Sequence, residues 1–129
     1  MRTARLMLVS FVSLLILASG ARAMEQRPFT DPAFTRAQDA GKAILIEIHA
    51  DWCPTCKAQL PILDRLSSQA PYADIVRLRV DFDAQKSVVK RFKATSQSTL
   101  VLYKGKAELA RSVGETDENR IRVMLDKAL

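Results

Sequence analysis

The apolar run at residues 44–49 limits the possible folds more than any other part of this chain. Nearly every position in it is apolar, and Ile44, Ile46 and Ile48 are β-branched. Such a run is typical of a strand that is buried on both faces of a parallel sheet. The sequence therefore predicts an α/β domain with this strand inside its sheet.

Helix and strand patterns alternate on either side of this run. Asp31 and Pro32 are expected to begin the first helix as its N-cap and first helical residue, and Gly41 is expected to end it. The other expected helices span residues 54–68, 85–93 and 116–129, and the other expected strands span residues 27–29, 75–81, 100–103 and 108–113. The last two strands are expected to form an antiparallel hairpin around Gly105.

Charge and apolar patterns give a first prediction of which sides of these elements are buried. Arg77 and Arg79 alternate with apolar residues and are interpreted as solvated strand charges. This alternation indicates that the strand at 75–81 is less enclosed than the strand before it. The apolar face of the last helix is expected to consist of Ile121, Val123, Leu125 and Leu129.

Cys53 and Cys56 are the only cysteines, and they directly follow the apolar strand at the start of a helical pattern. The first sulfur of such a pair meets the unpaired N–H groups and the positive dipole end of the helix, which favour its thiolate. A disulfide between these residues would close a loop of only a few residues and would stabilise the fold little. The spacing therefore favours redox or metal chemistry over a structural cross-link.

Residues 1–23 have the pattern of a secretory signal peptide. Arg2 and Arg5 precede an apolar run, and Ala21 and Ala23 are small residues at the positions that signal peptidase reads. The apolar run has twelve residues, fewer than the roughly 20 that span a bilayer. We therefore expect cleavage after Ala23, export to the bacterial periplasm and no stable membrane insertion of the mature chain.

The remaining residues, 24–129, suit one domain of 106 residues. The signal segment carries three basic residues, so the mature chain has 17 basic and 14 acidic residues and a net charge of +3 instead of +6. The basic residues are not interleaved with aromatic residues, which argues against nucleic acid as a partner. We expect a monomer, and no residue pattern indicates a cofactor.

The order of these elements, with Trp52 before the dithiol and Lys57 after it, resembles the thioredoxin family over nearly all of residues 28–129. Residues 43–53 look like the active-site strand and loop of the family, and residues 99–104 look like its fourth strand. The resemblance implies a thioredoxin fold, with a central mixed sheet flanked by helices and the dithiol exposed at one edge.

The same resemblance implies a thiol–disulfide oxidoreductase that acts on the cysteines of proteins through a dithiol–disulfide cycle. Cys53 is then the attacking sulfur and Cys56 is the buried resolving sulfur. For an exported reductant of this family, the expected redox partner is an electron donor in the membrane.

Three positions depart from the family pattern. Pro54 and Thr55 stand where thioredoxin has Gly-Pro, the dipeptide through which the family tunes its redox potential, so the direction of electron flow is not implied. Ser98 precedes Thr99 at the position of the family's cis-proline. Because a non-proline cis bond costs about 2.5 to 4 kcal/mol, a trans bond is expected there. His49 replaces an aromatic residue.

Glu47 places a carboxylate in the middle of the buried run and matches the buried aspartate of the family with one more methylene. Burial favours the neutral acid, so Glu47 is a candidate general base that removes the proton from Cys56 during resolution. The alternative is a glutamate at a sheet position that is open to solvent or that pairs with a basic residue such as Lys42 or Lys57.

The residues around the dithiol are candidates for substrate contact. Trp52 is expected either to shield the dithiol or to form part of a substrate-binding face. His49, the only histidine, is interpreted as a packing or hydrogen-bonding residue and not as a catalyst. The candidate substrate-binding residues are Trp52, Pro54, Thr55, Ser98 and Thr99.

Two other functions remain open at this point. A metal- or cluster-binding module could use Cys53, Cys56 and His49, but a closed zinc site usually has four protein ligands, so a dimer would be needed. A redox-inactive thioredoxin-like adaptor is the second alternative, and the presence of both cysteines argues against it.

Overall fold

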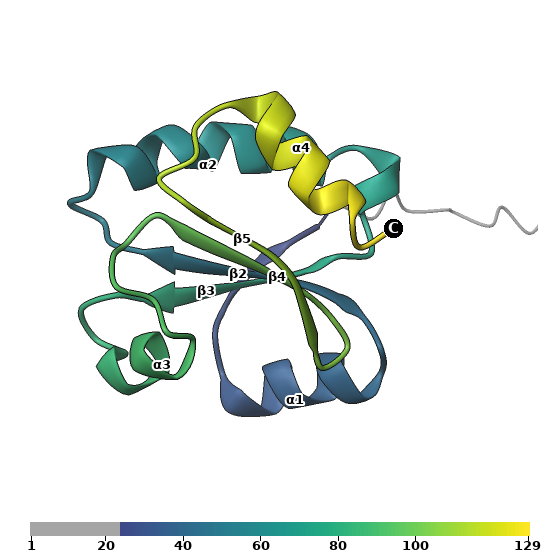
Figure 1. The fold of residues 1–129 in the computed structure, drawn as a ribbon, viewed down its shortest axis with the longest axis horizontal. Coiled ribbons are helices and arrows are strands. Elements are labelled where there is room, and N and C mark those ends of the chain that lie inside the picture. The colour runs from purple at the N-terminus through teal and green to yellow at the C-terminus, as the bar shows by residue number, and fades with distance from the viewer. Residues whose placement is uncertain (1–23) are drawn as a thin grey trace, which may run out of the picture.

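The computed structural model describes residues 24–129, and the predicted signal peptide at residues 1–23 lies outside this range. The described residues form one five-stranded sheet with helices on both faces (Figure 1). This architecture confirms the α/β class and the mixed sheet implied by the resemblance to thioredoxin. Within residues 24–129, no helix combines the length and the apolar character that a membrane crossing requires.

The strands of the sheet are β1 (Gln26–Pro28), β2 (Ala43–His49), β3 (Val76–Asp81), β4 (Thr99–Lys104) and β5 (Ala107–Val113), in the spatial order β1-β3-β2-β4-β5. β2 lies at the centre, parallel to β3 and antiparallel to β4, and all seven of its residues are buried. β4 and β5 form the predicted hairpin, and Gly105 has the positive φ that its tight turn requires.

The helices are α1 (Asp31–Asp39), α2 (Pro54–Ser67), α3 (Lys86–Arg91) and α4 (Glu118–Asp126), with a short 3₁₀ turn, η1 (Ala70–Tyr72), that the sequence pattern did not indicate. α2 and α4 cover one face of the sheet, and α1 and α3 cover the other (Figure 1). The chain therefore has two cores, because β2 is covered on both sides: Leu45 packs in the core with α2 and α4, whereas Ile44, Ile46 and Ile48 pack in the core with α1 and α3.

The first helix is capped by a different residue from the one expected. The N-cap of α1 is Thr30, whose hydroxyl accepts a hydrogen bond from the backbone N–H of Ala33 at 3.3 Å. Asp31 is the first helical residue, where its negative charge favours the positive end of the helix dipole. Both residues are good N-cap types, and the pattern alone did not separate two neighbouring candidates.

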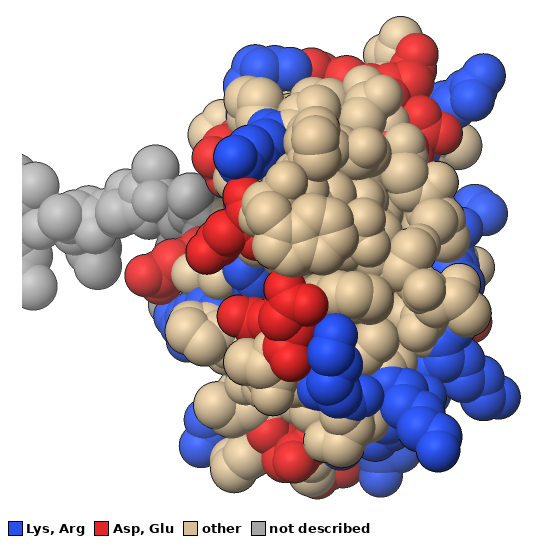
Figure 2. All heavy atoms as spheres, turned by 90° about the vertical axis from the view of Figure 1, so that its left-hand side faces the viewer, with Lys and Arg blue, Asp and Glu red and all other residues tan. Residues whose placement is uncertain are grey.

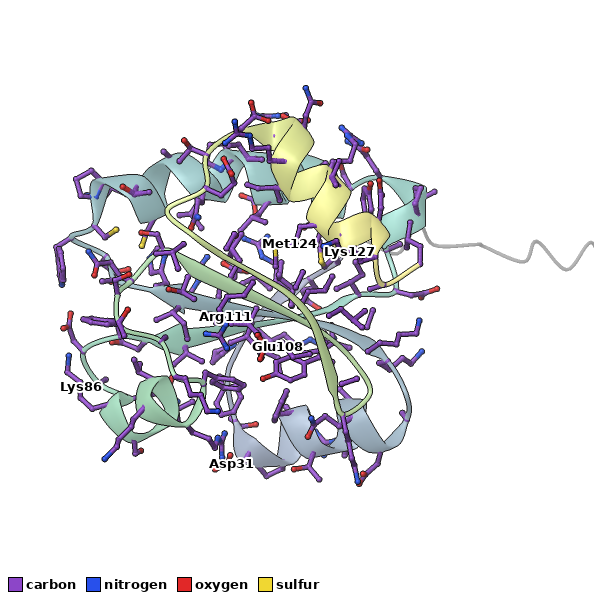
Figure 3. All side chains as sticks on the ribbon, viewed as in Figure 1. Asp31, Lys86, Glu108, Arg111, Met124 and Lys127 are labelled. Atoms are coloured by element: carbon purple, nitrogen blue, oxygen red, sulfur yellow. The ribbon has the colours of Figure 1, made fainter. Side chains whose placement is uncertain are left out.

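The apolar face of α4 also differs from the expectation. Val123 and Leu129 are 62% and 64% exposed, whereas Ile121, Met124 and Ala128 are buried. Figure 3 shows Met124 on the side of α4 that faces the sheet. Residues three, four and seven positions apart share one face of a helix, and Val123 lies only two positions after Ile121. The buried face therefore continues through Met124, and Ala128 is buried just after the helix ends.

Candidate active site

The dithiol lies where β2 ends and α2 begins. Cys53 is the N-cap of α2, and its Sγ accepts a hydrogen bond from the backbone N–H of Cys56 at 3.1 Å. Pro54 occupies the first helical position, where the missing N–H costs nothing. The sulfur of Cys53 thus has the role that a serine or aspartate oxygen has at other helix N-termini, as the sequence predicted.

Both cysteines are free thiols, and each residue is only 1% exposed. The resemblance implied an exposed dithiol, and this expectation is wrong for the arrangement described here. Cys53 and Cys56 form a small buried cluster with Ala50, and the ring of Phe82 packs against this cluster. Phe82 comes from the segment after β3, so the covering depends on a contact that is distant in the sequence. In this arrangement neither cysteine is open to a substrate at the surface.

Ser98 lies between the two sulfurs. Its Oγ is 3.4 Å from Sγ of Cys53 and 3.6 Å from Sγ of Cys56, and the second contact has the Cys56 thiol as donor. The peptide bond that precedes Ser98 is trans, as expected, because no cis bond occurs in residues 24–129. Ser98 is 5% exposed, so its hydroxyl meets the dithiol inside the protein.

The backbone of Ser98 has an unusual conformation. Its φ is +60°, in the left-handed region that residues other than glycine rarely adopt. Its N–H donates to the carbonyl of Ile48 at 2.8 Å, and its carbonyl accepts from the N–H of Gly114 at 3.0 Å and from Nε2 of Gln59 at 3.2 Å. Three hydrogen bonds from different segments therefore hold this conformation.

Gln59 is a site residue that the sequence reasoning missed. It is 4% exposed, and its Nε2 also donates to the carbonyl of Glu115 at 2.9 Å. Gln59 follows Cys56 by three positions in α2 and precedes the buried Leu63 by four, so it lies on the buried stripe of the helix. A polar residue on an apolar stripe was the signal that could have indicated its role.

The two thiols differ in pKa because their surroundings differ. Burial opposes ionisation of Cys53, but hydrogen bonds from the Cys56 thiol, the Ser98 hydroxyl and the backbone N–H groups of residues 55 and 56 outweigh it, so the pKa of Cys53 is lowered. Burial is the largest cause that raises the pKa of Cys56, and the hydrogen bond with Cys53 raises it further. Cys53 is thus the sulfur that ionises first, which fits its expected role as the attacking nucleophile.

Trp52 lies outside the dithiol and is 58% exposed. Its Nε1 donates to Oδ2 of Asp83 at 2.7 Å. Nζ of Lys86 lies 3.3 Å from the other oxygen of Asp83 and 4.2 Å from the centre of the Phe82 ring. The hydrogen bond from Trp52, followed by the contact with Lys86, lowers the pKa of Asp83. The exposure of Trp52 favours the substrate-binding interpretation over the shielding one.

The partners of Trp52 come from the segment after β3, which the sequence reasoning did not connect to the site. β2 and β3 are parallel and pair His49 with Asp81, so both strands end at the same edge of the sheet. The N–H of Phe82 donates to the carbonyl of His49 at 2.8 Å, which brings Phe82 beside the dithiol loop. In Figure 2, uncharged side chains form a continuous area at this end of the molecule, with charged groups around it.

Glu47 is buried in an ion-pair cluster. Nε and Nη2 of Arg77 donate to its two carboxylate oxygens, and Nη2 of Arg79 lies 3.4 Å from Oε2. The ion-pair partners of Glu47 are therefore Arg77 and Arg79, and not Lys42 or Lys57. Among the described residues, no hydrogen bond joins Glu47 to either sulfur, and its role as a general base stays a prediction.

Arg77 was expected to be solvated, but it is only 2% exposed. It also donates from Nη1 to Oδ1 of Asp64 at 2.7 Å, so α2 supplies a second carboxylate. Burial alone lowers the pKa of a guanidinium, but the hydrogen bonds and charges of Glu47 and Asp64 outweigh burial and raise the pKa of Arg77. The alternating pattern of β3 could not show this, because the acidic partners come from β2 and α2.

The other candidates lie at different depths. Pro54 is exposed and Thr55 is half-buried at the start of α2, whereas Thr99 is fully buried and its hydroxyl donates to the carbonyl of Ser96 at 2.8 Å. The Thr99 side chain thus does not reach the surface in this arrangement. Nε2 of His49 lies 3.1 Å from Oδ1 of Asp51, which confirms a hydrogen-bonding role for this histidine.

The metal-binding alternative finds no further ligands near the dithiol. Within residues 24–129, no three side chains of the types histidine, cysteine, aspartate and glutamate gather in a group that could hold a metal ion. The arrangement around Cys53 and Cys56 instead fits thiol exchange, because it lowers the pKa of one thiol and raises the pKa of the other.

Comparisons with known proteins agree with this chemistry. The sequence model of the thioredoxin family matches residues 26–127. The thioredoxin of Chlamydia muridarum is 34% identical over 88 residues, which cover 68% of this chain and 84% of that protein. Thioredoxin-1 of Saccharomyces cerevisiae is 35% identical over 78 residues, which cover 60% of this chain and 72% of that protein.

Solved structures show the same relationship. The crystal structure of Trxlp from Edwardsiella tarda EIB202 is 40% identical, has a TM-score of 0.76 and covers 78% of this chain and 98% of that chain. Thioredoxin NaTrxh from Nicotiana alata, at 23% identity and a TM-score of 0.71, covers 85% of this chain and 97% of that chain and supports the fold alone. With its dithiol at the start of α2 and a family match over nearly the whole described region, the chain belongs to the thioredoxin family of thiol–disulfide oxidoreductases.

Proposed function

We propose that this chain exchanges disulfides with protein substrates outside the cytoplasm, with Cys53 as the attacking sulfur and Cys56 as the resolving sulfur. The observation that carries the proposal is the environment of the two thiols at the N-terminus of α2. Sγ of Cys53 accepts a backbone hydrogen bond and has a lowered pKa, whereas the pKa of Cys56 is raised. Only the first thiol is thus prepared to start the reaction.

The cycle follows from this difference. The Cys53 thiolate attacks one sulfur of a substrate disulfide, which forms a mixed disulfide and releases the other substrate sulfur as a thiolate that takes up a proton. Cys56 then loses its proton and attacks Sγ of Cys53, which releases the second substrate sulfur and forms the Cys53–Cys56 disulfide. Two electrons pass from the dithiol to the substrate, and the reverse sequence oxidises a substrate dithiol.

The surface around the dithiol supports a protein substrate. Trp52 is 58% exposed, and Figure 2 shows a continuous area of uncharged side chains at this end of the molecule. An amphipathic tryptophan on such an area is a common contact for a protein partner. In the proposed complex, the substrate displaces the covering at Phe82, and Trp52 and Pro54 contact the substrate on either side of Cys53.

Export and recycling complete the proposal. The signal-peptide pattern of residues 1–23 supports delivery to the periplasm, where a membrane electron donor would reduce the Cys53–Cys56 disulfide after each turnover. A fusion of residues 1–23 to a phosphatase that is active only outside the cytoplasm tests the first step. Phosphatase activity in intact cells is expected, and an inactive, uncleaved fusion would contradict export.

A pair of matched serine variants tests the cycle. Cys53→Ser should abolish reduction of a protein disulfide such as that of insulin, because the attacking sulfur is missing. Cys56→Ser should instead accumulate mixed disulfides with substrates, because the first step proceeds and the second does not. Normal turnover by Cys53→Ser would refute the proposed mechanism.

Equilibration of the protein with glutathione measures the redox potential of the Cys53–Cys56 pair and gives the direction of electron flow. A potential near −270 mV, roughly that of thioredoxin, indicates a reductant, and one near about −120 mV indicates an oxidant.

A further inference from the structure

We propose that Ser98 is a catalytic residue whose hydroxyl joins the two sulfurs, accepting a hydrogen bond from the Cys56 thiol and donating one to the Cys53 thiolate. This inference rests on the proposed function and adds a third reacting group to the dithiol. It concerns the position at which this chain departs most clearly from the family pattern. Ser98 stands where the family has a cis-proline, and a proline side chain has no hydroxyl to offer.

The geometry allows both hydrogen bonds at once. Oγ of Ser98 is 3.4 Å from Sγ of Cys53 and 3.6 Å from Sγ of Cys56, within the longer distances that sulfur requires. A serine hydroxyl has one donor and two acceptor sites, so it can accept from the thiol while it donates to the thiolate. Hydrogen bonds in such a chain polarise one another. The negative charge on Cys53 is therefore shared across three side chains.

Burial makes this hydroxyl difficult to replace. Ser98, Cys53 and Cys56 are 5%, 1% and 1% exposed, so bulk water has little access to the sulfur of Cys53. The Cys56 thiol has one proton, so while it donates to Ser98 it does not donate to Cys53. The remaining donors to the Cys53 sulfur are then the backbone N–H groups of residues 55 and 56. Without the Ser98 hydroxyl, the Cys53 thiolate is still buried and still destabilised by burial, but it has lost one of the charge-assisted hydrogen bonds that offset this destabilisation.

The backbone around Ser98 indicates that the hydroxyl is held in place. A left-handed φ at a residue other than glycine persists only where the surrounding structure enforces it, and such residues cluster at active sites. Here the backbone N–H and carbonyl of Ser98 are fixed by Ile48, Gly114 and Gln59. Gln59 thus acts as a positioning residue, because it touches the carbonyl of Ser98 and neither sulfur.

The chemical step is the ionisation of Cys53, in which the S–H bond breaks and the proton leaves to solvent or to a base of the substrate. No redox co-reactant is needed. The hydroxyl favours the thiolate product over the thiol and therefore increases the fraction of molecules that can attack a disulfide. Because the thiolate exists only in the reduced protein, the same interaction stabilises the reduced form relative to the disulfide.

Two variants of the full-length reduced protein test this role. Ser98→Ala removes the hydroxyl, and Ser98→Gly removes it while fitting the left-handed backbone without strain. Ser96→Ala makes the same chemical change in the same loop, at a half-buried residue for which the structure records no contact with sulfur, and is the matched control. Ultraviolet absorbance of the thiolate across pH and the rate of alkylation of Cys53 by iodoacetamide, located by mass spectrometry, are the measurements.

Both Ser98 variants should shift the thiolate titration to higher pH. Alkylation of Cys53 at mildly acidic pH should slow roughly tenfold, which corresponds to a loss of about 1.4 kcal/mol from the thiolate, and Ser96→Ala should leave both readings unchanged. An unchanged titration in a folded Ser98→Ala or Ser98→Gly protein would overturn the inference. These readings need no turnover, so they stand even if insulin reduction shows that the proposed function is wrong.

Discussion

The buried pair of Glu47 and Arg77 provides a quantitative test of the packing between β2, β3 and α2. Their side chains are 4% and 2% exposed, so both charges have left water almost completely. Replacement of Glu47 by glutamine removes the negative charge and leaves Arg77 with Asp64, whose side chain is 68% exposed. An exposed carboxylate compensates a buried cation only weakly, because water screens it.

The expected loss follows from these exposures. Removing one partner of a buried ion pair typically costs about 3 to 5 kcal/mol, because the other charge remains buried without compensation. Glutamine still offers one acceptor oxygen to Arg77, so we expect the lower end, about 3 kcal/mol. For a domain of this size, that loss lowers the melting temperature by roughly 12 °C or more.

Urea denaturation of Glu47→Gln, followed by circular dichroism, measures this loss as a lower midpoint at an unchanged slope. Asp64→Asn is the control, because it removes the exposed partner and should cost less than about 1 kcal/mol. The double variant Glu47→Leu/Arg77→Met replaces both charges by apolar groups and should recover most of the stability. The reasoning would be refuted if Glu47→Gln unfolded at the same urea concentration as the original protein.

Three further predictions concern the site itself. As the general base for Cys56, Glu47 predicts that Glu47→Gln slows resolution of a mixed disulfide by roughly tenfold or more and leaves the first attack unchanged. Rapid-quench kinetics measure both steps, and resolution at the same rate in Glu47→Gln and in the unchanged protein would contradict this role. The fluorescence of Trp52, the only tryptophan, should change as the pH falls, with a midpoint below the ordinary carboxyl pKa of 3.8. The reason is that the pKa of Asp83 is lowered, so Asp83 keeps its charge and its hydrogen bond to Trp52 until the pH falls through that lowered value. Asp83→Asn should abolish this transition, and a midpoint above 3.8 would contradict the assignment. Phe82→Ala should speed alkylation of Cys53 several-fold by opening the covering of the dithiol, as mass spectrometry would show, whereas an unchanged rate would mean that other groups limit access.

The features that could be predicted from the sequence are those set by neighbouring residues. The apolar run of β2 and the Cys53–Cys56 spacing at the start of α2 depend on local pattern, and the structure places both where expected. Local pattern also fixed the hairpin at Gly105. These signals sufficed to predict the fold and the location of the dithiol.

The features that could not be predicted depend on contacts between distant segments. Alternation in β3 shows that Arg77 and Arg79 share a face, but it does not show that Glu47 and Asp64 meet Arg77 there. The burial of the dithiol involves Phe82 in the same way, which follows β3 and comes from a distant part of the sequence. Similarly, the composition of the loop before β4 identified Ser98 as a departure from the family, but only the fold shows its hydroxyl between the two sulfurs.

The side chain of Gln59 has a consequence for how the protein opens. Its amide nitrogen joins α2 to the carbonyl of Ser98 before β4 and to the carbonyl of Glu115 after β5. Neither loop can separate from α2 without breaking a hydrogen bond of the same amide, so local unfolding at this end should involve both loops together. In native-state hydrogen exchange, the N–H groups of Ser98 and Gly114 should therefore exchange as one cooperative unit.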